Sequence, residues 1–226
     1  MKEKIIEYFS RHFYPQNIIA KAIIQDLNKN SSQILIDAPC GNGETTWHFS
    51  NLKNLDVFGY DHDLQSINIA KKRFKANNLF FLQEDILLIN NHQKKVDYFC
   101  MINSLFLFSD PKAVLKSAKN MMNKKGLLFV ILPNVRGKNY KWFIKNDNKN
   151  KLELLNETFE DYFNDLGFEI LKTKYLAYTH HYGRSDIKLF SLFSHIYLRI
   201  LNTFQTCFKI GPPNYYLLIL QNKDES

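Results

Sequence analysis

Three acidic side chains follow short apolar segments in the first half of the chain, at points where they could bind a nucleotide-like cofactor. Asp37, Asp61 and Asp85 each stand at or just after the end of an apolar run that predicts a buried strand. Asp61 lies 24 residues beyond Asp37, and an acidic residue at about this distance is where a ribose hydroxyl pair is bound. A carboxylate is a suitable acceptor for paired hydroxyls or for an amine. The three acids should therefore meet at one edge of a parallel sheet.

The segment Asp37-Ala38-Pro39-Cys40-Gly41-Asn42-Gly43 predicts a tight turn between the first strand and a helix that begins near Glu44. Such a turn lets a ligand approach bare backbone, with N–H groups at the start of the helix facing it. A dinucleotide-binding dehydrogenase would have a third glycine in place of Thr46 to pack the helix against the strand, so a pyrophosphate site is disfavoured. We interpret Cys40 as a small apolar filler of the turn rather than as a nucleophile.

These segments together resemble the class I S-adenosylmethionine-dependent methyltransferase family, whose nucleotide loop has the pattern D-x-G-x-G-x-G. The chain has D-A-P-C-G-N-G, so Pro39 stands where the first glycine usually lies and stiffens the first bend. The resemblance covers roughly residues 26–132 and is weaker toward the C-terminus. It implies a methyltransferase that uses S-adenosylmethionine as its cofactor.

The resemblance also implies a role for each polar residue at the predicted sheet edge. The backbone of residues 37–43 would hold the methionine part of the cofactor, and Asp61 would accept from both ribose hydroxyls. Asp85 would accept from the adenine amino group, and the N–H of Ile86 would bind a ring nitrogen. The complete set implied to bind the cofactor is Asp37, Ala38, Pro39, Cys40, Gly41, Gly43, Asp61, His62, Asp85, Ile86 and Asn103.

Each polar residue also has a purely structural interpretation. Asp37 could cap the turn that follows it, and Asp85 could be an ordinary solvated loop residue. Asp63 could be the N-cap of a helix over residues 64–74 rather than a ligand-binding residue. Asn103 could be a turn residue after the fourth strand.

The rest of the sequence predicts the elements that must position these residues. Residues 96–102, 127–132, 168–176 and 215–221 predict four further strands. Asp110 followed by Pro111 predicts the start of a helix that runs to about Met122 and stops near Gly126. In the resembled family the seventh strand inserts antiparallel between the fifth and sixth, giving the order 3-2-1-4-5-7-6. We therefore expect an α/β, Rossmann-like, doubly wound seven-stranded sheet, with N-terminal helices and a helical cap before the last strand.

A single domain over residues 1–226 is expected from the length of the chain and its 45% hydrophobic content, and the resemblance implies that it is a methyltransferase domain. It would comprise N-terminal helices (1–30), a cofactor-binding core (31–134) and two cap segments on the substrate side (135–155 and 178–213). Within the second cap segment, residues 187–208 are rich in Phe, Leu, Ile and Tyr but too polar to span a bilayer. A lid or pocket wall, a membrane-surface helix and plain core packing all remain open for them.

An apolar cap favours a small apolar or aromatic acceptor, such as a quinone, a polyketide or a lipid-like metabolite. A general base is needed only if the acceptor must lose a proton. The candidates are His180, His181, Tyr182 and His195 in the cap, with His12 and Tyr14 near the N-terminus. We select His180 and His181, because they follow the sixth predicted strand in the variable region. The alternative is that both are polar loop histidines. No third ligand at a characteristic spacing accompanies this pair, so no metal site is predicted.

The net charge of +8 raises the alternative of an RNA methyltransferase. Only five of the 30 basic residues are arginine, and the lysines are spread along the whole chain, which favours a solvated surface over a nucleic-acid track. The segment Asn103-Ser104-Leu105-Phe106 also departs from the N-P-P-Y signature of amino-methylating nucleic-acid enzymes. A third alternative is a non-catalytic protein that binds the cofactor.

The three cysteines are scattered and form no CxxC pair, which indicates a reducing compartment. The N-terminus lacks the apolar core and cleavage pattern of a signal peptide. A cytoplasmic protein is therefore expected, with membrane-surface contact through residues 187–208 as the alternative. The oligomeric state does not follow from the sequence.

Overall fold

A seven-stranded sheet forms the centre of the computed structural model, which describes residues 15–28, 31–89, 95–133, 159–176 and 215–223. The strand order is β3-β2-β1-β4-β5-β7-β6. The first five strands pair in parallel, whereas β7 lies antiparallel between β5 and β6. The predicted fold class, strand order and antiparallel seventh strand are confirmed.

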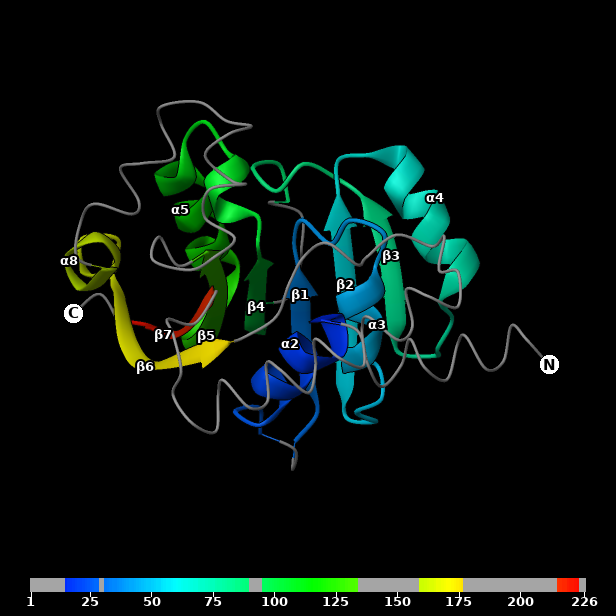
Figure 1. Ribbon diagram of the computed structural model, residues 1–226, viewed down its shortest axis with the longest axis horizontal. Coiled ribbons are helices and arrows are strands. Elements are labelled where there is room, and N and C mark those ends of the chain that lie inside the picture. Colours follow the sequence, from blue (N-terminus) through cyan, green and yellow to red (C-terminus); the bar gives the residue numbers. More distant parts are fainter. Residues whose placement is uncertain (1–14, 29–30, 90–94, 134–158, 177–214, 224–226) are drawn as a thin grey trace, which may run out of the picture.

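Helices and strands alternate from α2 to β3 in the described part of the chain. The strands are β1 (Gln33–Asp37), β2 (Leu55–Asp61), β3 (Leu79–Gln83), β4 (Val96–Ile102), β5 (Met122–Pro133), β6 (Phe168–Leu176) and β7 (Tyr215–Asn222). The helices are α2 (Pro15–Ile24), α3 (Glu44–Phe49), α4 (Leu64–Arg73), the 3₁₀ turn η1 (Leu105–Leu107), α5 (Pro111–Met121) and α8 (Phe159–Asn164). Figure 1 shows α4 beside β3 at one end of the sheet and α8 beside β6 at the other.

Apolar side chains of the helices bury both faces of the sheet. One buried cluster brings Ile23 of α2, Phe49 of α3 and Ile67 of α4 against the central strands. The second cluster packs Leu115 of α5 and Phe163 of α8 against the opposite face. Because the central strands are covered on both sides, they consist of nearly continuous apolar runs, as parallel strands in doubly wound folds do.

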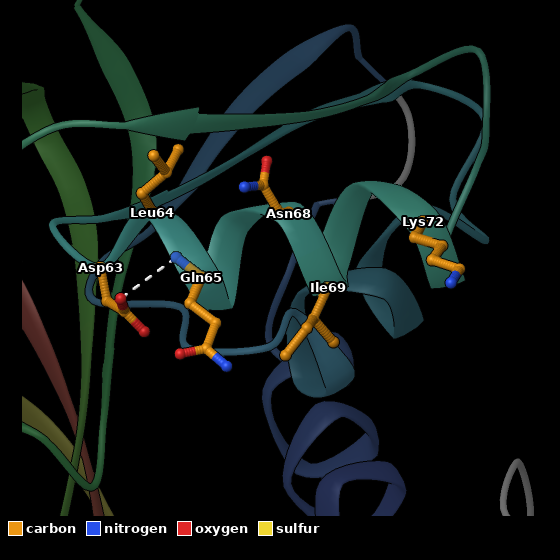
Figure 2. Close-up of a pocket in the computed structure, with 6 residues that line it drawn as sticks. All are labelled: Asp63, Leu64, Gln65, Asn68, Ile69 and Lys72. Carbon is orange, nitrogen blue, oxygen red and sulfur yellow. Dashed lines mark hydrogen bonds between the residues drawn. The ribbon is translucent and has the colours of Figure 1, made fainter.

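Two helices begin where side-chain caps were expected. Asp63 accepts hydrogen bonds of 3.1 Å from the N–H groups of Gln65 and Ser66, so it caps α4; Figure 2 shows its bond to Gln65. Asp110 caps α5 through a 2.9 Å bond from the N–H of Ala113. Such caps satisfy N–H groups that have no partner within the helix. The predicted structural role of Asp63 is confirmed.

The start of β5 differs from the prediction. We expected a helix that runs to about Met122 and stops near Gly126, followed by a strand from Leu127. The helix α5 ends at Met121, close to the expected residue, but β5 begins at Met122 immediately after it. Its register against β4 shifts between Met122 and Leu127, so the extra residues bulge out of the ladder. Lys125 adopts the left-handed conformation there, with φ 62°. A bulge of this kind is set by strand pairing and has no clear signal in the local sequence.

The predicted N-terminal and cap segments are covered only in part. Of the expected N-terminal helices over residues 1–30, α2 is observed, and residues 1–14 lie outside the described residues. The cap segments 135–155 and 178–213, with the apolar stretch 187–208, also lie entirely outside them. Among the helices of the described ranges, none is long and apolar enough to cross a membrane.

Candidate functional site

The turn after β1 crosses the ends of the two neighbouring strands. The N–H of Ala38 donates a 3.0 Å hydrogen bond to the carbonyl of Cys100 in β4, and the N–H of Cys40 donates a 2.8 Å bond to the carbonyl of Tyr60 in β2. The peptide between Ala38 and Pro39 is cis. The predicted glycine turn therefore lies at the carboxyl edge of the sheet, where open α/β sheets bind their ligands.

The two glycines of the turn have different surroundings. Both adopt left-handed backbone conformations, with φ 53° at Gly41 and φ 73° at Gly43. A Cβ on Gly43 would lie 2.5 Å from the ring of Phe81 and 3.0 Å from the Cβ of Ala70, whereas a Cβ on Gly41 would meet nothing within 4 Å. Gly43 thus allows close packing against β3 and α4, and Gly41 borders open space.

Asp37 is the last residue of β1 and is only 1% exposed. Its Oδ2 accepts a 2.6 Å hydrogen bond from Oγ1 of Thr46, while its Oδ1 is buried and has no partner. Burial raises the pKa of Asp37 to about 7, the bond from Thr46 lowers it, and the nearby Asp61 charge raises it. In the sequence, Thr46 was considered only because it replaces the third glycine of a dinucleotide-binding turn. Its bond to Asp37 was missed, although a hydroxyl side chain nine residues after the acid could have indicated it.

Asp61 ends β2 and joins the turn to the start of α4. Its Oδ2 accepts a 2.7 Å hydrogen bond from the N–H of Gly41, and its Oδ1 accepts a 2.9 Å bond from the N–H of Asp63. Nδ1 of the neighbouring His62 lies 3.4 Å from Oδ1, on a side chain that is 81% exposed. A carboxylate has about four lone-pair sites, so these two backbone bonds leave capacity for further donors.

Asp85 and Ile86 form the turn after β3. Oδ1 of Asp85 accepts a 2.9 Å bond from the N–H of Leu87, and the Asp85 side chain is exposed. Ile86 is buried, and its carbonyl accepts a 2.9 Å bond from Oγ of Ser117 in α5. The turn is thus fixed from the α5 side of the sheet.

The segment after β4 contributes a second buried polar atom without a partner. Asn103 adopts a left-handed conformation with φ 52°, and its N–H donates a 3.2 Å bond to the carbonyl of Ile131. The next residue, Ser104, is 3% exposed and its Oγ is buried without a partner. Sequence reasoning selected Asn103, and the adjacent Ser104 carried no signal beyond its position at a strand end.

Glu44 links three helices directly after the glycine turn. Its Oε2 accepts a 3.1 Å bond from Nε2 of Gln16 in α2, and its Oε1 pairs with Nη1 of Arg73 in α4 at 2.6 Å. The far end of α2 is held against β6 by Lys174, which pairs with Asp26. None of these long-range contacts was predicted from the sequence.

A shallow groove follows the outer face of α4 (Figure 2). Its lining starts at Asp63, two residues beyond Asp61, and continues away from the glycine turn along the helix. The lining residues are Asp63, Leu64, Gln65, Asn68, Ile69 and Lys72. Most of them are exposed. The groove borders the candidate site through Asp63, but Asp37, Asp61 and Asp85 do not line it.

Two further expectations concern catalysis and metals. The predicted bases His180 and His181 lie outside the described residues. Among the residues that the structure does describe, no group of three or more His, Cys, Asp or Glu side chains could hold a metal ion.

Comparison with known proteins identifies the family of this chain. A family model described as a methyltransferase domain matches residues 29–182. A protein of Invertebrate iridescent virus 6, whose name describes it as a methyltransferase (235L), is 30% identical over 167 residues. That match covers 72% of this chain and 62% of the length of the viral relative. The chain belongs to the methyltransferase-domain family.

Solved structures show the same fold. A SAM-dependent methyltransferase from Thermotoga maritima is 18% identical with a TM-score of 0.62, over 99% of this chain and 96% of that one. Magnesium protoporphyrin IX methyltransferase from Synechocystis PCC 6803, with bound SAH, is 12% identical with a TM-score of 0.59, over 92% of this chain and 82% of that one. The sheet, the glycine turn and the family match together identify a class I methyltransferase fold, as the sequence resemblance predicted.

Proposed function

We propose that this protein binds S-adenosylmethionine at the carboxyl edge of its sheet and transfers the methyl group to a small acceptor. The observation that carries the proposal is the glycine turn between two buried acids. Asp37 and Asp61 lie on either side of it, at 1% and 7% exposure. Gly41 borders open space between them.

The polar groups at this edge fit the chemistry of the cofactor. S-adenosylmethionine carries an ammonium, a ribose diol and an adenine amine, all of which donate hydrogen bonds. The edge offers acceptors: the unpartnered Oδ1 of Asp37, the unpartnered Oγ of Ser104 and the remaining lone pairs of Asp61. Gly41 lies next to these acceptors. Because it has no side chain, a ligand can approach its backbone closely.

The roles of individual residues follow the sequence resemblance. The backbone of residues 37–43 would hold the methionine part, and Asp61 would accept from the ribose hydroxyls. Asp85 would accept from the adenine amine beside the N–H of Ile86, and Asn103 would border the methyl group. His62 was also predicted to bind the cofactor. Its side chain is exposed and would lie at the rim of the ribose site.

The bound cofactor supplies a methyl group that is already activated by the sulfonium. The protein must then align the acceptor with that methyl group and exclude water, and positioning of this kind can lower a barrier by about 7–11 kcal/mol. A base would add roughly 10²–10⁴ in rate if the acceptor must lose a proton, and His180 or His181 would supply it. These histidine roles rest on the sequence alone.

A small apolar or aromatic acceptor is proposed because of the composition of the chain. Residues 187–208 are rich in aromatic and aliphatic side chains, and residues 103–106 lack the N-P-P-Y signature of amino-methylating nucleic-acid enzymes. The Synechocystis relative in fold is named for an acceptor with a large aromatic ring system, magnesium protoporphyrin IX. This neighbour supports the proposal by analogy of fold alone.

Isothermal calorimetry with S-adenosylmethionine, S-adenosylhomocysteine and NAD tests the cofactor. Binding of the first two without binding of NAD supports the proposal, and the absence of binding to both adenosyl ligands overturns it. Tight binding without turnover on any apolar acceptor would instead favour a non-catalytic cofactor-binding protein.

The charge of +8 keeps an RNA acceptor as the second candidate. RNA affinity that falls steeply with salt, with a linear log–log slope, would favour it. Weak RNA binding at 50 mM salt and turnover on an aromatic metabolite would exclude it.

A further inference from the structure

The outer side of β3 is a free edge of the sheet. β3 lies at one end of the strand order, and no other described strand pairs with its outer side (Figure 1). The carbonyl of Asn78 accepts a 2.8 Å hydrogen bond from β2, and the N–H of Glu84 donates a 3.0 Å bond to it. The peptide groups of successive residues point to alternate sides of a strand. Phe81 and Gln83 therefore direct N–H and C=O groups to the outer side, and Leu79 directs its carbonyl there.

The edge strand at the other end of the sheet is protected against pairing, whereas β3 is not. β6 carries exposed Lys172, has a register shift after Ile170, and is held to α2 by the pairing of Lys174 with Asp26. Charges and irregularities of this kind are how proteins block an edge strand. β3 has the sequence Leu-Phe-Phe-Leu-Gln, without a charge or a proline, and its pairing with β2 is regular. Its free edge is a suitable template for another strand.

The side chains of β3 add an apolar surface to this edge. Phe80 and Leu82 lie on the same face of the strand and are 42% and 39% exposed. The ring of Phe80 stacks on Phe58 of β2 at 5.0 Å, which fixes its orientation. Of the eight large apolar side chains that are exposed in the described part of the chain, four lie between residues 80 and 88: Phe80, Leu82, Leu87 and Leu88. Such a concentration marks an interaction surface.

The exposed charges beside β3 differ in sign between its two ends. The acids near its carboxyl end are Asp63, Glu84 and Asp85. The bases near its amino end, on the last turn of α4 and the segment that leads into β3, are Lys71, Lys72 and Lys75. A surface with this distribution is complementary to its own copy after a half turn, because each acidic end then meets a basic end.

We propose that two copies of this chain pair through β3, antiparallel, about a two-fold axis at Phe81, so that their sheets form one continuous sheet. Phe81 then exchanges both backbone hydrogen bonds with Phe81 of the second copy, and Leu79 faces Gln83. Phe80 lies opposite Leu82 of the second copy on the same face, so that each exposed apolar side chain covers the other. The inference goes beyond the proposed function and does not depend on it.

A second copy fits this edge better than an unrelated chain because two independent patterns are self-complementary. A half turn about Phe81 places Phe80 against Leu82, and the same half turn places the acidic end against the basic end. This register is also the one that pairs all three residues whose backbone groups face outward, Leu79, Phe81 and Gln83. A shift by two residues in either direction would leave one of them without a partner.

Sedimentation equilibrium of the ligand-free full chain tests the proposal. At about 100 μM, above the micromolar Kd of the weaker standard-size interfaces, the wild type should approach twice the chain mass of 26.7 kDa. Leu82→Lys places a charge opposite Phe80 of the second copy and should keep the mass at 26.7 kDa. The matched control, Leu171→Lys, changes an exposed leucine on the edge strand β6 and should dimerise like the wild type.

Three results of this experiment would overturn the proposal. They are a wild type that stays at the mass of one chain, a dimer that persists in Leu82→Lys, and a dimer that Leu171→Lys weakens as much as Leu82→Lys does. The first result would leave the β3 edge to a different partner. Each of them leaves the proposed methyl transfer intact, because cofactor binding is measured separately.

A charge exchange tests the same interface without changing an apolar residue. Glu84→Lys turns an acidic end toward the basic end of the second copy and should raise the dimer Kd by about two- to tenfold. Adding Lys75→Glu should recover part of this loss. Both side chains are exposed, so these variants decide the question even if Leu82→Lys does not fold. An unchanged Kd in Glu84→Lys, or no recovery in the double variant, overturns the antiparallel arrangement.

Discussion

The N–H of Gly41 donates a 2.7 Å hydrogen bond to Oδ2 of Asp61, so the acid at the end of β2 holds the turn that follows β1. The other oxygen of Asp61 accepts from the N–H of Asp63 and so reaches the start of α4. Asp61 thus holds the glycine turn and the start of α4 together. If it also accepts from the ribose, as proposed, cofactor affinity and turn geometry would be coupled through this one carboxylate.

Replacement of Asp61 by alanine should weaken S-adenosylmethionine binding ten- to a hundredfold. The reason is that a hydrogen bond to a charged group contributes about 1.5–3 kcal/mol, and the N–H of Gly41 also loses its acceptor. Calorimetry measures the affinity, and circular dichroism checks that the fold is intact. Asp56→Ala, at the opposite end of the same strand, is the control. Unchanged affinity in Asp61→Ala would remove this residue from the ribose site.

The two glycines of the turn should respond differently to alanine. In Gly43→Ala, a left-handed φ of 73° and a Cβ 2.5 Å from Phe81 combine backbone strain with overpacking, so the free energy of unfolding should fall by about 2–4 kcal/mol. Gly41→Ala has only the backbone cost of about 1–2 kcal/mol, because its Cβ would point into open space.

Thermal melts and ligand titrations of this matched pair separate stability from binding. The open space at Gly41 belongs to the proposed cofactor site. Gly41→Ala should therefore show the larger loss of affinity for the adenosyl ligands. Gly43→Ala should show the larger drop in melting temperature. A greater loss of stability in Gly41→Ala than in Gly43→Ala would contradict the packing described for Phe81 and Ala70.

The sequence predicted the sheet well because its strands are short apolar runs with clear ends. β4 and β6 have the predicted bounds, and the caps at Asp63 and Asp110 were identified from residue type and spacing. The early start of β5 was missed, because a bulge depends on pairing with β4 rather than on local propensity.

The arrangement of the candidate site could be predicted only where a residue stands at a strand end. The positions of Asp37 and Asp61 at the ends of β1 and β2 were predicted in this way. The bond of Thr46 to Asp37 and the contacts of Glu44 with Gln16 and Arg73 were missed. These contacts join residues on different elements, and their geometry arises only when the helices pack on the sheet.

Replacement of Thr46 by valine should raise the pKa of Asp37 further. The bond from Thr46 favours the charged carboxylate and lowers this pKa, and valine fills a similar volume without a donor. The midpoint of the Asp37 titration, followed by denaturant unfolding at a series of pH values, should therefore move to higher pH. Thr45→Val is the neighbouring control on a half-buried position. A midpoint that stays in place would show that Thr46 does not stabilise the charged form.

Replacement of Asp37 by asparagine should stabilise the ligand-free protein, and the gain should grow with pH. The pKa of Asp37 is about 7 in the folded protein and near 3.8 in the unfolded chain. Between these values the unfolded chain loses its proton while the folded protein keeps it, so this residue lowers the stability of the wild type as the pH rises. Above pH 7 both states are ionised and the penalty is constant, on the order of a few kcal/mol.

Denaturant unfolding of wild type and Asp37→Asn at pH 5, 6, 7 and 8 measures this difference. Taking the difference cancels the titration of groups common to both proteins. The free energy of unfolding of Asp37→Asn should exceed that of the wild type by a margin that increases from pH 5 to pH 7 and then levels off. A margin that shrinks with rising pH in the ligand-free proteins would mean that Asp37 is stabilised, rather than strained, by its charge.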